Sequence, residues 1–518
     1  MSENTFDCIV VGSGNAGSCA AHSAVESGCT RVLIVEKGPK EWVGGNGFFT
    51  AGAHRTVHGG LADLLPLVQN APSDAAATID MEPYTAEQFA GDIMRLGDGR
   101  SDPGLVQAVV DRSRDAVQWL ADRVGVPFTF SFNRQAYLVN GRQKFWGGMV
   151  LSVEDGGKGL IAAHQRALER EGAETWFDTP AVSLIYDGES VKGVEVLRGG
   201  QPVRIYAPAV VLACGGYEAS PKLREQNLGT DWVRAKVRGT PYNTGDGLSL
   251  ASAVGAKLYG DFASCHSTCW DFNAPSDRGD RELSNQFTKS GYPLGVMVNA
   301  NGQRFVDEGA DFRNYTYAKF GRAILGQPGG FAFQIWDKRV LDWLRKEEYG
   351  DDVVEKIRAE SAEELGDKLV ERGLEDRDAF VLTLASYNDA VRTFREENPD
   401  KQWDPAVKDG LSTQSSRTSL ELPKSNWALP IDEAPFLAVK VTCGITFTFG
   451  GLAIDPNTAA VISAQSSRPI NGLFCTGELV GGLFYGNYPG GSGLTAGAVF
   501  GIAAGREAAR LAKEQMSS

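Results

Sequence analysis

The feature that most constrains the fold is a glycine turn between two apolar runs near the N-terminus. Residues 6–11 are apolar and β-branched, residues 12–17 read G-x-G-x-x-G, and residues 31–35 form a second apolar run. Residues 18–28 between them have a helical pattern. Near-continuous apolar strands joined through a helix are typical of a parallel sheet covered on both faces. We therefore predict an α/β fold built on such a sheet.

The spacing of these glycines indicates a dinucleotide site. Gly12 permits the tight turn, Gly14 lets the backbone approach a pyrophosphate, and Gly17 lets the helix pack closely on the strand. Glu36 ends the second apolar run about 20 residues further on, where an acid accepts hydrogen bonds from ribose hydroxyls. The alternative is an ordinary glycine turn without a ligand.

Two further segments are rich in small residues. Residues 44–47 and 50–52 follow Lys37, and their backbone N–H groups would reach a phosphate or a flat ring without side-chain clash. Near the C-terminus, an expected strand at 472–476 leads to Gly477-Glu478. A nicotinamide enzyme would not need the first of these loops; the alternative explanation for it is a solvent-exposed turn.

A helix is expected after the glycine run at 490–493, with Gly493, Gly497, Gly501 and Gly505 on one face. Its N-terminus offers free N–H donors and positive potential, which suit the negative charge of a reduced flavin ring. Close packing of this helix on the sheet is the other explanation, and both can hold at once.

Composition narrows the function classes. A net charge of −14 argues against nucleic acid partners, and no apolar stretch reaches the roughly 18 residues of a membrane span. The strand that starts at residue 6 leaves no room for a signal peptide, and eight scattered cysteines favour reduced thiols. We therefore expect a cytoplasmic enzyme.

The order of patterns along the 518 residues indicates two domains. A small β-meander is expected within 191–213, and residues 338–400 are charged and helical. From about 470 the chain returns to strand, glycine turn and helix. We predict one domain made of residues 1–264 and 446–518, and an inserted α+β domain at 265–445.

Taken together, the motifs resemble the flavoprotein family of fumarate reductase and succinate dehydrogenase. The matching pieces are GSGNAG with Glu36, VVLACGGY at 210–217, TGDG at 244–247, VNANGQRFVDE at 298–308, FGGLAID at 449–455, and LFCTGELVGG with GNYPGGSGL at 473–494. GGNGFFTAGAHRTVHGG and GNYPGGSGLTAGAVFG are most similar to the tricarballylate dehydrogenase branch, and NYPGGSG also resembles 3-ketosteroid dehydrogenases.

The resemblance implies a Rossmann-like FAD-binding domain, a capping domain over the flavin, and hydride transfer between flavin N5 and a C–C bond next to a carbonyl or carboxyl group. His54 and His58 lie just past the stretch where some members attach flavin, in a pattern more like the non-covalent members, so non-covalent FAD is expected. The implied FAD-binding residues are Gly12, Ser13, Gly14, Asn15, Ala16, Gly17, Glu36, Lys37, Gly45, Asn46, Gly47, Thr50, Ala51, Gly52, Val182, Ala213, Gly215, Asp246, Gly477, Glu478, Ser492, Gly493 and Leu494.

By position, the resemblance makes Arg313 the catalytic arginine, with one residue more than the usual spacing from the RFV-acid-Glu motif. A forked, fixed positive charge can stabilise an enolate and bind a carboxylate. Glu308 would hold this guanidinium in place. The alternative for Arg313 is a surface ion pair.

The departures from the family concern substrate binding. Thr446 takes the place of a histidine, Tyr488 takes that of an arginine, and the usual proton relay falls near Thr288 and Gly291. These changes argue against fumarate or succinate as substrate. Tyr488 would hydrogen-bond a carbonyl or form an aromatic wall.

Several further residues give weaker indications of function. Arg55 and His54 would supply a replacement anion contact. Cys265-His266-x-x-Cys269 has metal-ligand residue types but no second cluster, so no metal site is predicted. Tyr137, in an aromatic stretch, would either cover the substrate or belong to an ordinary core.

We therefore expect an FAD-dependent dehydrogenase or reductase that acts on a small carbonyl or carboxylate substrate and exchanges electrons with an external acceptor or donor. A tricarballylate-like polycarboxylate and a neutral keto compound both remain open as substrates. A non-catalytic flavin-binding electron-transfer subunit is a further alternative. A pyridine-nucleotide disulfide oxidoreductase would need a Cys-x-x-Cys pair and a second G-x-G-x-x-G, and the sequence has neither.

Overall fold

The first sheet is the expected parallel sheet, built from both ends of the chain. The computed structural model describes residues 4–517. The neighbouring strands of this sheet are parallel except for the outer pair β21 and β22. In spatial order they are β21 (Ala460–Ile462), β22 (Pro469–Cys475), β12 (Val210–Leu212), β1 (Cys8–Val11), β2 (Val32–Val35) and β8 (Glu174–Trp176).

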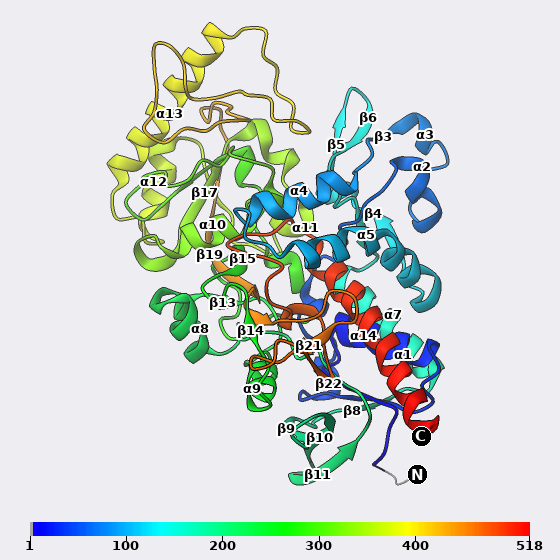
Figure 1. Ribbon diagram of the computed structural model, residues 1–518. Coiled ribbons are helices and arrows are strands. Elements are labelled where there is room, and N and C mark those ends of the chain that lie inside the picture. Colours follow the sequence, from blue (N-terminus) through cyan, green and yellow to red (C-terminus); the bar gives the residue numbers. More distant parts are fainter. Residues whose placement is uncertain (1–3, 518) are drawn as a thin grey trace.

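Helices α1 (Asn15–Glu26) and α14 (Ser492–Ser517) lie side by side against this sheet (Figure 1). A Cβ at Gly501 would lie 2.6 Å from the Ala16 carbonyl oxygen, and one at Gly505 would lie 2.4 Å from that of Ala20. Close packing of the two backbones therefore accounts for these two glycines of the four-residue repeat.

The predicted meander follows on the same part of the chain. It is a three-stranded antiparallel sheet of β9 (Ala181–Tyr186), β10 (Val191–Arg198) and β11 (Gln201–Tyr206), and it leads directly into β12. The prediction included the second and third of these strands and began one strand too late.

A second sheet is built around the long strand β19 (Phe436–Thr448), which has both parallel and antiparallel neighbours. Alternate residues of its strands face two separate cores. Val298 and Ile335 face α12 (Ala362–Val370) and α13 (Arg377–Glu397), whereas Met297 and Trp336 face α10 (Tyr317–Leu325). The elements of this layer are β13 (Lys236–Val237), β15 (Cys265–Asp271), β16 (Val296–Val298), β17 (Ala332–Trp336), β18 (Ile357–Ala359), α10 (Tyr317–Leu325), α12 (Ala362–Val370) and α13 (Arg377–Glu397).

The remaining α-helices and β-strands of the described residues complete the fold. They are α2 (Leu61–Leu64), α3 (Ala75–Thr78), β3 (Ile79–Met81), α4 (Ala86–Leu96), α5 (Pro103–Trp119), β4 (Phe128–Phe130), α6 (Phe132–Gln135), β5 (Ala136–Val139), β6 (Arg142–Phe145), β7 (Leu151–Val153), α7 (Gly156–Glu171), α8 (Pro221–Leu228), α9 (Asp246–Ala253), β14 (Leu258–Tyr259), α11 (Lys346–Tyr349) and β20 (Gly451–Leu452).

The architecture is therefore α/β, with a parallel sheet, a meander and additional sheets. The predicted domain limits remain predictions. Two strands bear on them: β19 runs across residue 446, and β13 pairs with β19 although it lies within residues 1–264.

Candidate active site

The glycines of the first turn have two different reasons to be glycine. A Cβ at Gly12, whose φ is +111°, would lie 2.3 Å from the Ala213 carbonyl oxygen, and one at Gly17 would lie 2.1 Å from that of Gly12. Packing thus requires glycine at both positions. At Gly14 and Gly45 the nearest protein atoms would be 3.7 and 3.8 Å away, and both residues line a cleft. The space that these two residues leave belongs to the cleft.

This cleft lies at the carboxyl ends of β1, β2, β12 and β22, where open α/β sheets bind ligands. Most of the residues that the sequence analysis assigned to the cofactor line it. They are Gly12, Ser13, Gly14, Asn15, Ala16, Glu36, Lys37, Gly45, Asn46, Gly47, Thr50, Ala51, Ala213, Gly215, Asp246, Gly477, Glu478, Gly493 and Leu494.

Four assigned residues do not line the cleft. Gly17 packs against Gly12, and a Cβ at Gly52 would lie 2.9 Å from the Val153 side chain. The buried Ser492 hydroxyl donates to the Pro489 carbonyl oxygen at 2.7 Å. Val182 points away, with 44% of its surface exposed, and its neighbour Ala181 lines the cleft instead.

Glu36 is held at the end of β2 in an orientation set by its neighbours. Its carboxylate accepts hydrogen bonds from the Ser13 hydroxyl at 2.6 Å, the Ser13 N–H at 3.0 Å and the Gly38 N–H at 2.8 Å. Next to it, the Lys37 ammonium donates to Thr244 and forms an ion pair with Asp246 at 2.6 Å. Both strand-end residues are thus fixed in the wall of the cleft.

Asn46 connects the second glycine loop to the long strand of the other sheet. Its amide nitrogen donates to the Glu218 carboxylate and to the Thr446 carbonyl oxygen, both at 2.5 Å, and its oxygen accepts from the Thr240 N–H at 2.9 Å. Burial raises the pKa of Glu218 and, together with Glu218, that of Glu478. Of these two neighbouring carboxyl groups, Glu478 lines the cleft.

These features fit a dinucleotide that carries a flat ring. Gly14 and Gly45 open the wall near the N-terminus of α1, where backbone N–H groups suit a pyrophosphate. At the N-terminus of α14, a Cβ on Gly493 would meet no protein atom closer than 3.6 Å. This opening is consistent with the role expected for the N-terminus of α14, which is to stabilise the negative charge of a reduced flavin ring.

Beyond the glycine-lined part, the same cleft is lined by residues of the second sheet and its connections. Two of the expected residues, Thr446 and Tyr488, are there. The other lining residues were not predicted from the sequence as catalytic or cofactor-binding residues. We call this part the polar end, and its further residues are Ser131, Arg134, Met149, Arg238, His266, Thr268, Asn285, Thr288, Tyr317 and Phe447.

Arg238 follows directly on β13 and has no acidic partner among residues 4–517. Its guanidinium donates to the Thr446 hydroxyl at 3.0 Å and to the Asn285 amide oxygen at 2.5 Å. Burial lowers its pKa to about 10, which still leaves it charged at neutral pH. A strand-end arginine shortly before the TGDG motif was the available sequence signal.

Tyr488 contributes an aromatic wall with a polar tip. Its ring meets that of His266 edge-on at 4.8 Å and that of Phe447 at 5.6 Å between centroids. Burial raises the pKa of Tyr488 above its usual value, so the hydroxyl keeps its proton and can donate a hydrogen bond.

Arg313 lies buried on the segment that meets the glycine run before α14. The Gly490 N–H donates to the Asn314 carbonyl oxygen at 2.9 Å, and the Asn487 amide donates to that of Tyr315 at 2.7 Å. Burial and the neighbouring Arg345 lower the pKa of Arg313. Its side chain makes no hydrogen bond or ion pair within residues 4–517, and it adjoins the polar end through Tyr317 without lining it.

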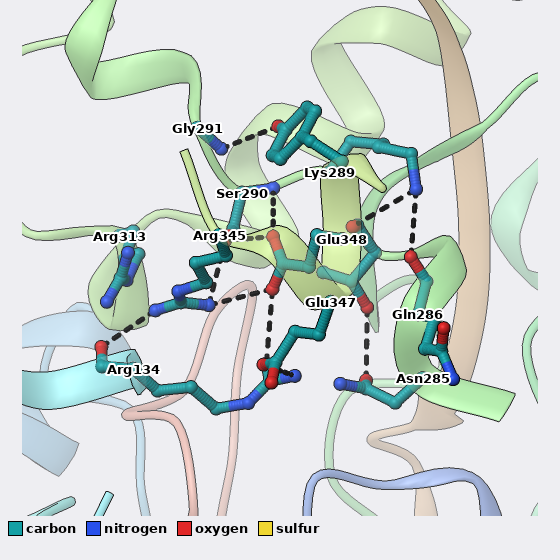
Figure 2. A network of polar contacts seen from close by, with 12 residues as sticks. Arg134, Asn285, Gln286, Lys289, Ser290, Gly291, Arg313, Arg345, Glu347 and Glu348 are labelled. Carbon is teal, nitrogen blue, oxygen red and sulfur yellow. Dashed lines mark hydrogen bonds and ion pairs between the residues drawn. The ribbon is translucent and has the colours of Figure 1, made fainter. Parts of the chain in front are cut away.

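Figure 2 shows Arg313 next to a network centred on Glu348 of α11. The Glu348 carboxylate accepts from Arg345 at 2.8 Å, from Arg134 at 3.2 Å and from the Ser290 hydroxyl at 2.6 Å. Burial alone would raise the pKa of Glu348, but the two arginines and Ser290 lower it to about 2. Arg134 lines the cleft, so this network reaches the polar end.

Three other expected catalytic residues have structural partners. Glu308 does not hold Arg313, because its carboxylate pairs with Arg304 at 2.5 Å, four residues earlier in the same motif. Arg55 donates to the Gly490 carbonyl oxygen at 2.8 Å, and His54 pairs with the Gly52 carbonyl oxygen at 2.9 Å. Burial lowers the pKa of His54 to about 4, and neither residue lines the cleft.

Strand β15 separates the ligand types of the Cys-His-x-x-Cys pattern. Cys265 and Cys269 pack into apolar cores, whereas His266 lines the cleft. Over residues 4–517 we find no group of three His, Cys, Asp or Glu side chains arranged to hold a metal ion. Within the same range, no helix combines the length and the apolar character that crossing a membrane requires.

Comparison with known proteins agrees with this geometry. The family described as "FAD binding domain" matches residues 7–494. The NADH:fumarate oxidoreductase of Klebsiella pneumoniae is 27% identical over 519 residues, which cover 98% of this chain and 48% of that protein. This chain thus spans about half the length of that relative.

Two solved structures share the fold. The open conformation of a flavocytochrome c3 fumarate reductase superposes with a TM-score of 0.69 at 27% identity, over 98% of this chain and 79% of the other. The 3-ketosteroid Δ1-dehydrogenase of Sterolibacterium denitrificans gives 0.72 at 21% identity, over 98% and 100%. The chain therefore belongs to the FAD-binding domain family that includes the fumarate reductase flavoproteins, FAD is its cofactor, and it is an FAD-dependent oxidoreductase.

Proposed function

We propose that this protein oxidises or reduces a C–C bond adjacent to a carboxyl group, with a tricarballylate-like polycarboxylate as substrate. The observation that supports this most is the continuity of one cleft from the glycine-lined part to the polar end. A substrate at the polar end shares that cleft with the cofactor.

The residues suggest a division of labour. FAD, when bound non-covalently in the glycine-lined part, exchanges the hydride. In the oxidative direction a base takes the proton from the α carbon of the substrate, the β carbon gives up a hydride, and an external acceptor takes the two electrons; reduction reverses this with an external donor. Arg313, which adjoins the polar end, adds a fixed positive charge that favours the enolate at the α position.

The eight cysteines are all unpaired, which supports a reducing compartment such as the cytoplasm.

Fumarate itself is not part of the proposal, although it is named in the relatives. Thr446 and Tyr488 stand where the resemblance implies the histidine and arginine of a dicarboxylate clamp. A neutral ketone is the second candidate. It is favoured by Tyr488, whose protonated hydroxyl in an aromatic wall suits a carbonyl oxygen.

Anaerobic mixing of the yellow holoenzyme with substrates tests the proposal. The panel is tricarballylate, succinate, a 3-ketosteroid and a cyclic enone, the last offered to the chemically reduced enzyme. We expect tricarballylate to bleach the flavin absorbance. The proposal fails if no carboxylate changes the redox state of a flavin that a chemical reductant bleaches normally.

A further inference from the structure

Arg238 is a buried cation that faces a cavity without a counter-ion. Only 8% of the residue is exposed, and buried arginines are usually paired with a carboxylate. Within residues 4–517 its guanidinium donates to the neutral oxygens of Thr446 and Asn285 and lies over the Trp270 ring. No acidic side chain of residues 4–517 forms an ion pair with it.

Two donors at this point have no acceptor. The Arg238 Nε and the Asn285 Nδ2 are both buried without a hydrogen-bond partner within residues 4–517. Because a guanidinium only donates, the atom of Asn285 that faces Arg238 must be its oxygen, and its NH₂ group is available. Both residues line the cleft. Buried unsatisfied donors are costly, so the pair calls for a ligand with acceptor oxygens.

The surrounding charges also leave an excess of positive charge. Arg134, Arg313 and Arg345 gather around two carboxylates, Glu347 and Glu348 (Figure 2). One positive charge therefore remains there, and Arg238 adds a second.

The other titratable neighbours of Arg238 do not offset this charge. Burial and Arg238 hold the pKa of His266 well below its ordinary value, so the ring is neutral. Burial keeps Tyr488 protonated. The polar end is thus suited to two negative charges on a ligand.

We propose that Arg238 and Asn285 bind one carboxylate of the substrate, and that Arg134, the member of the Arg134–Arg313–Arg345 group that lines the cleft, receives a second. The inference makes the substrate a polycarboxylate and speaks against the neutral ketone. This inference rests on the proposed function only in placing the substrate at the polar end. It makes Arg238 a specificity-determining residue.

The chain offers a matched control in Arg224. It is buried to a similar degree, donates to the Ala235 carbonyl oxygen at 2.6 Å, and has an unpartnered Nε. It does not line the cleft. An unpaired buried arginine is therefore tolerated in packing alone, and the test must show that Arg238 differs.

The first measurement uses the unmodified holoenzyme. Flavin difference spectra, recorded anaerobically, give dissociation constants for tricarballylate, its trimethyl ester and 4-androstene-3,17-dione. We expect the acid to bind about 100-fold more tightly than the ester. Equal affinity for acid and ester, or tighter binding of the steroid, overturns the inference without any variant.

The second measurement compares R238Q, R238K and R224Q, each checked for FAD content and thermal stability. We expect R238Q to lose about 100-fold in tricarballylate affinity with its ester affinity unchanged, R238K to lose about tenfold, and R224Q to stay within about twofold. If R224Q weakens binding as much as R238Q, the inference is wrong.

The outcomes separate this inference from the proposed reaction. If tricarballylate binds through Arg238 but the flavin never changes redox state, the binding site stands and the reaction falls. If a neutral enone reoxidises the reduced flavin while tricarballylate does not bind, C–C redox chemistry stands and the carboxylate site falls.

Discussion

The two parts of the cleft are built in opposite ways. The glycine-lined part is made of backbone and small residues that are contiguous in sequence, such as 12–16 and 45–47. The polar end is made of long side chains from segments far apart, among them Arg134, Arg238 and Asn285. This difference shows that cofactor recognition here depends on the spacing of residues close together in the sequence, whereas substrate recognition depends on tertiary contacts.

The largest effect is expected at Glu348, which neutralises much of the polar end. E348Q leaves Arg345 and Arg134 without their buried counter-charge, and breaking such a pair costs about 3–5 kcal/mol. Urea unfolding of the holoenzyme measures this loss. E347Q is the control: Glu347 is one-third exposed and its ion pair within residues 4–517 is with Arg134, so the expected cost is about 0–1 kcal/mol. Equal losses would mean that Glu348 is not the centre of the network.

The lowered pKa of Glu348 also predicts that the free energy of unfolding depends on pH. Its pKa is about 2 in the folded protein against an ordinary value of 4.5, so the unfolded chain binds the proton more readily. The stabilisation is complete above pH 4.5 and is lost as the pH falls toward 2, by about 3 kcal/mol in total. Unfolding free energies measured between pH 6 and 3 should show a slope that E348Q reduces. An unchanged slope in E348Q would assign the acid sensitivity to other groups.

Replacing Arg313 separates an effect on the reaction at the polar end from an effect on cofactor binding. R313A should lower kcat by about 10²–10³-fold, or about 2.7–4 kcal/mol, because a fixed charge is lost where the enolate forms. The FAD content should not change, because Arg313 does not line the cleft beside the glycines. Steady-state kinetics with a soluble dye and the flavin-to-protein ratio measure the two quantities. Activity that survives R313A would remove Arg313 from the mechanism.

The matching test of the glycine-lined part is G14V. No protein atom would lie within 3.7 Å of the added Cβ, so the fold should persist while FAD affinity falls about tenfold, or 1.4 kcal/mol. Fluorescence titration of the deflavinated protein measures that affinity. G91V is the control, because Gly91 is also free of contacts within 4 Å but lies on the exposed face of α4. Loss of FAD in both variants would indicate general destabilisation.

The sequence predicted the parallel sheet, the meander and the glycine-lined part because each depends on local periodicity or spacing. It did not identify Arg238, since only the pairing of β13 with β19 brings that residue to the cleft. Glu308 was assigned to Arg313, yet Arg304 at i−4 competes for its carboxylate and holds it. Arg55 and His54 follow the small-residue loop directly but turn toward the Gly490 and Gly52 backbone. Side-chain direction, not position in the chain, separates these residues from the site.

The smallest effect is expected where sequence and structure differ by a single residue. The resemblance assigns Val182 to FAD, but a strand alternates its faces, and Ala181 is the residue that lines the cleft. V182T should therefore leave FAD affinity within about 0.5 kcal/mol, whereas A181F should weaken it by filling the space beside the ligand. The same fluorescence titration compares the two variants. If V182T released FAD and A181F did not, the register of β9 would have to shift by one residue, and the alternation that defines this wall of the cleft would be reversed.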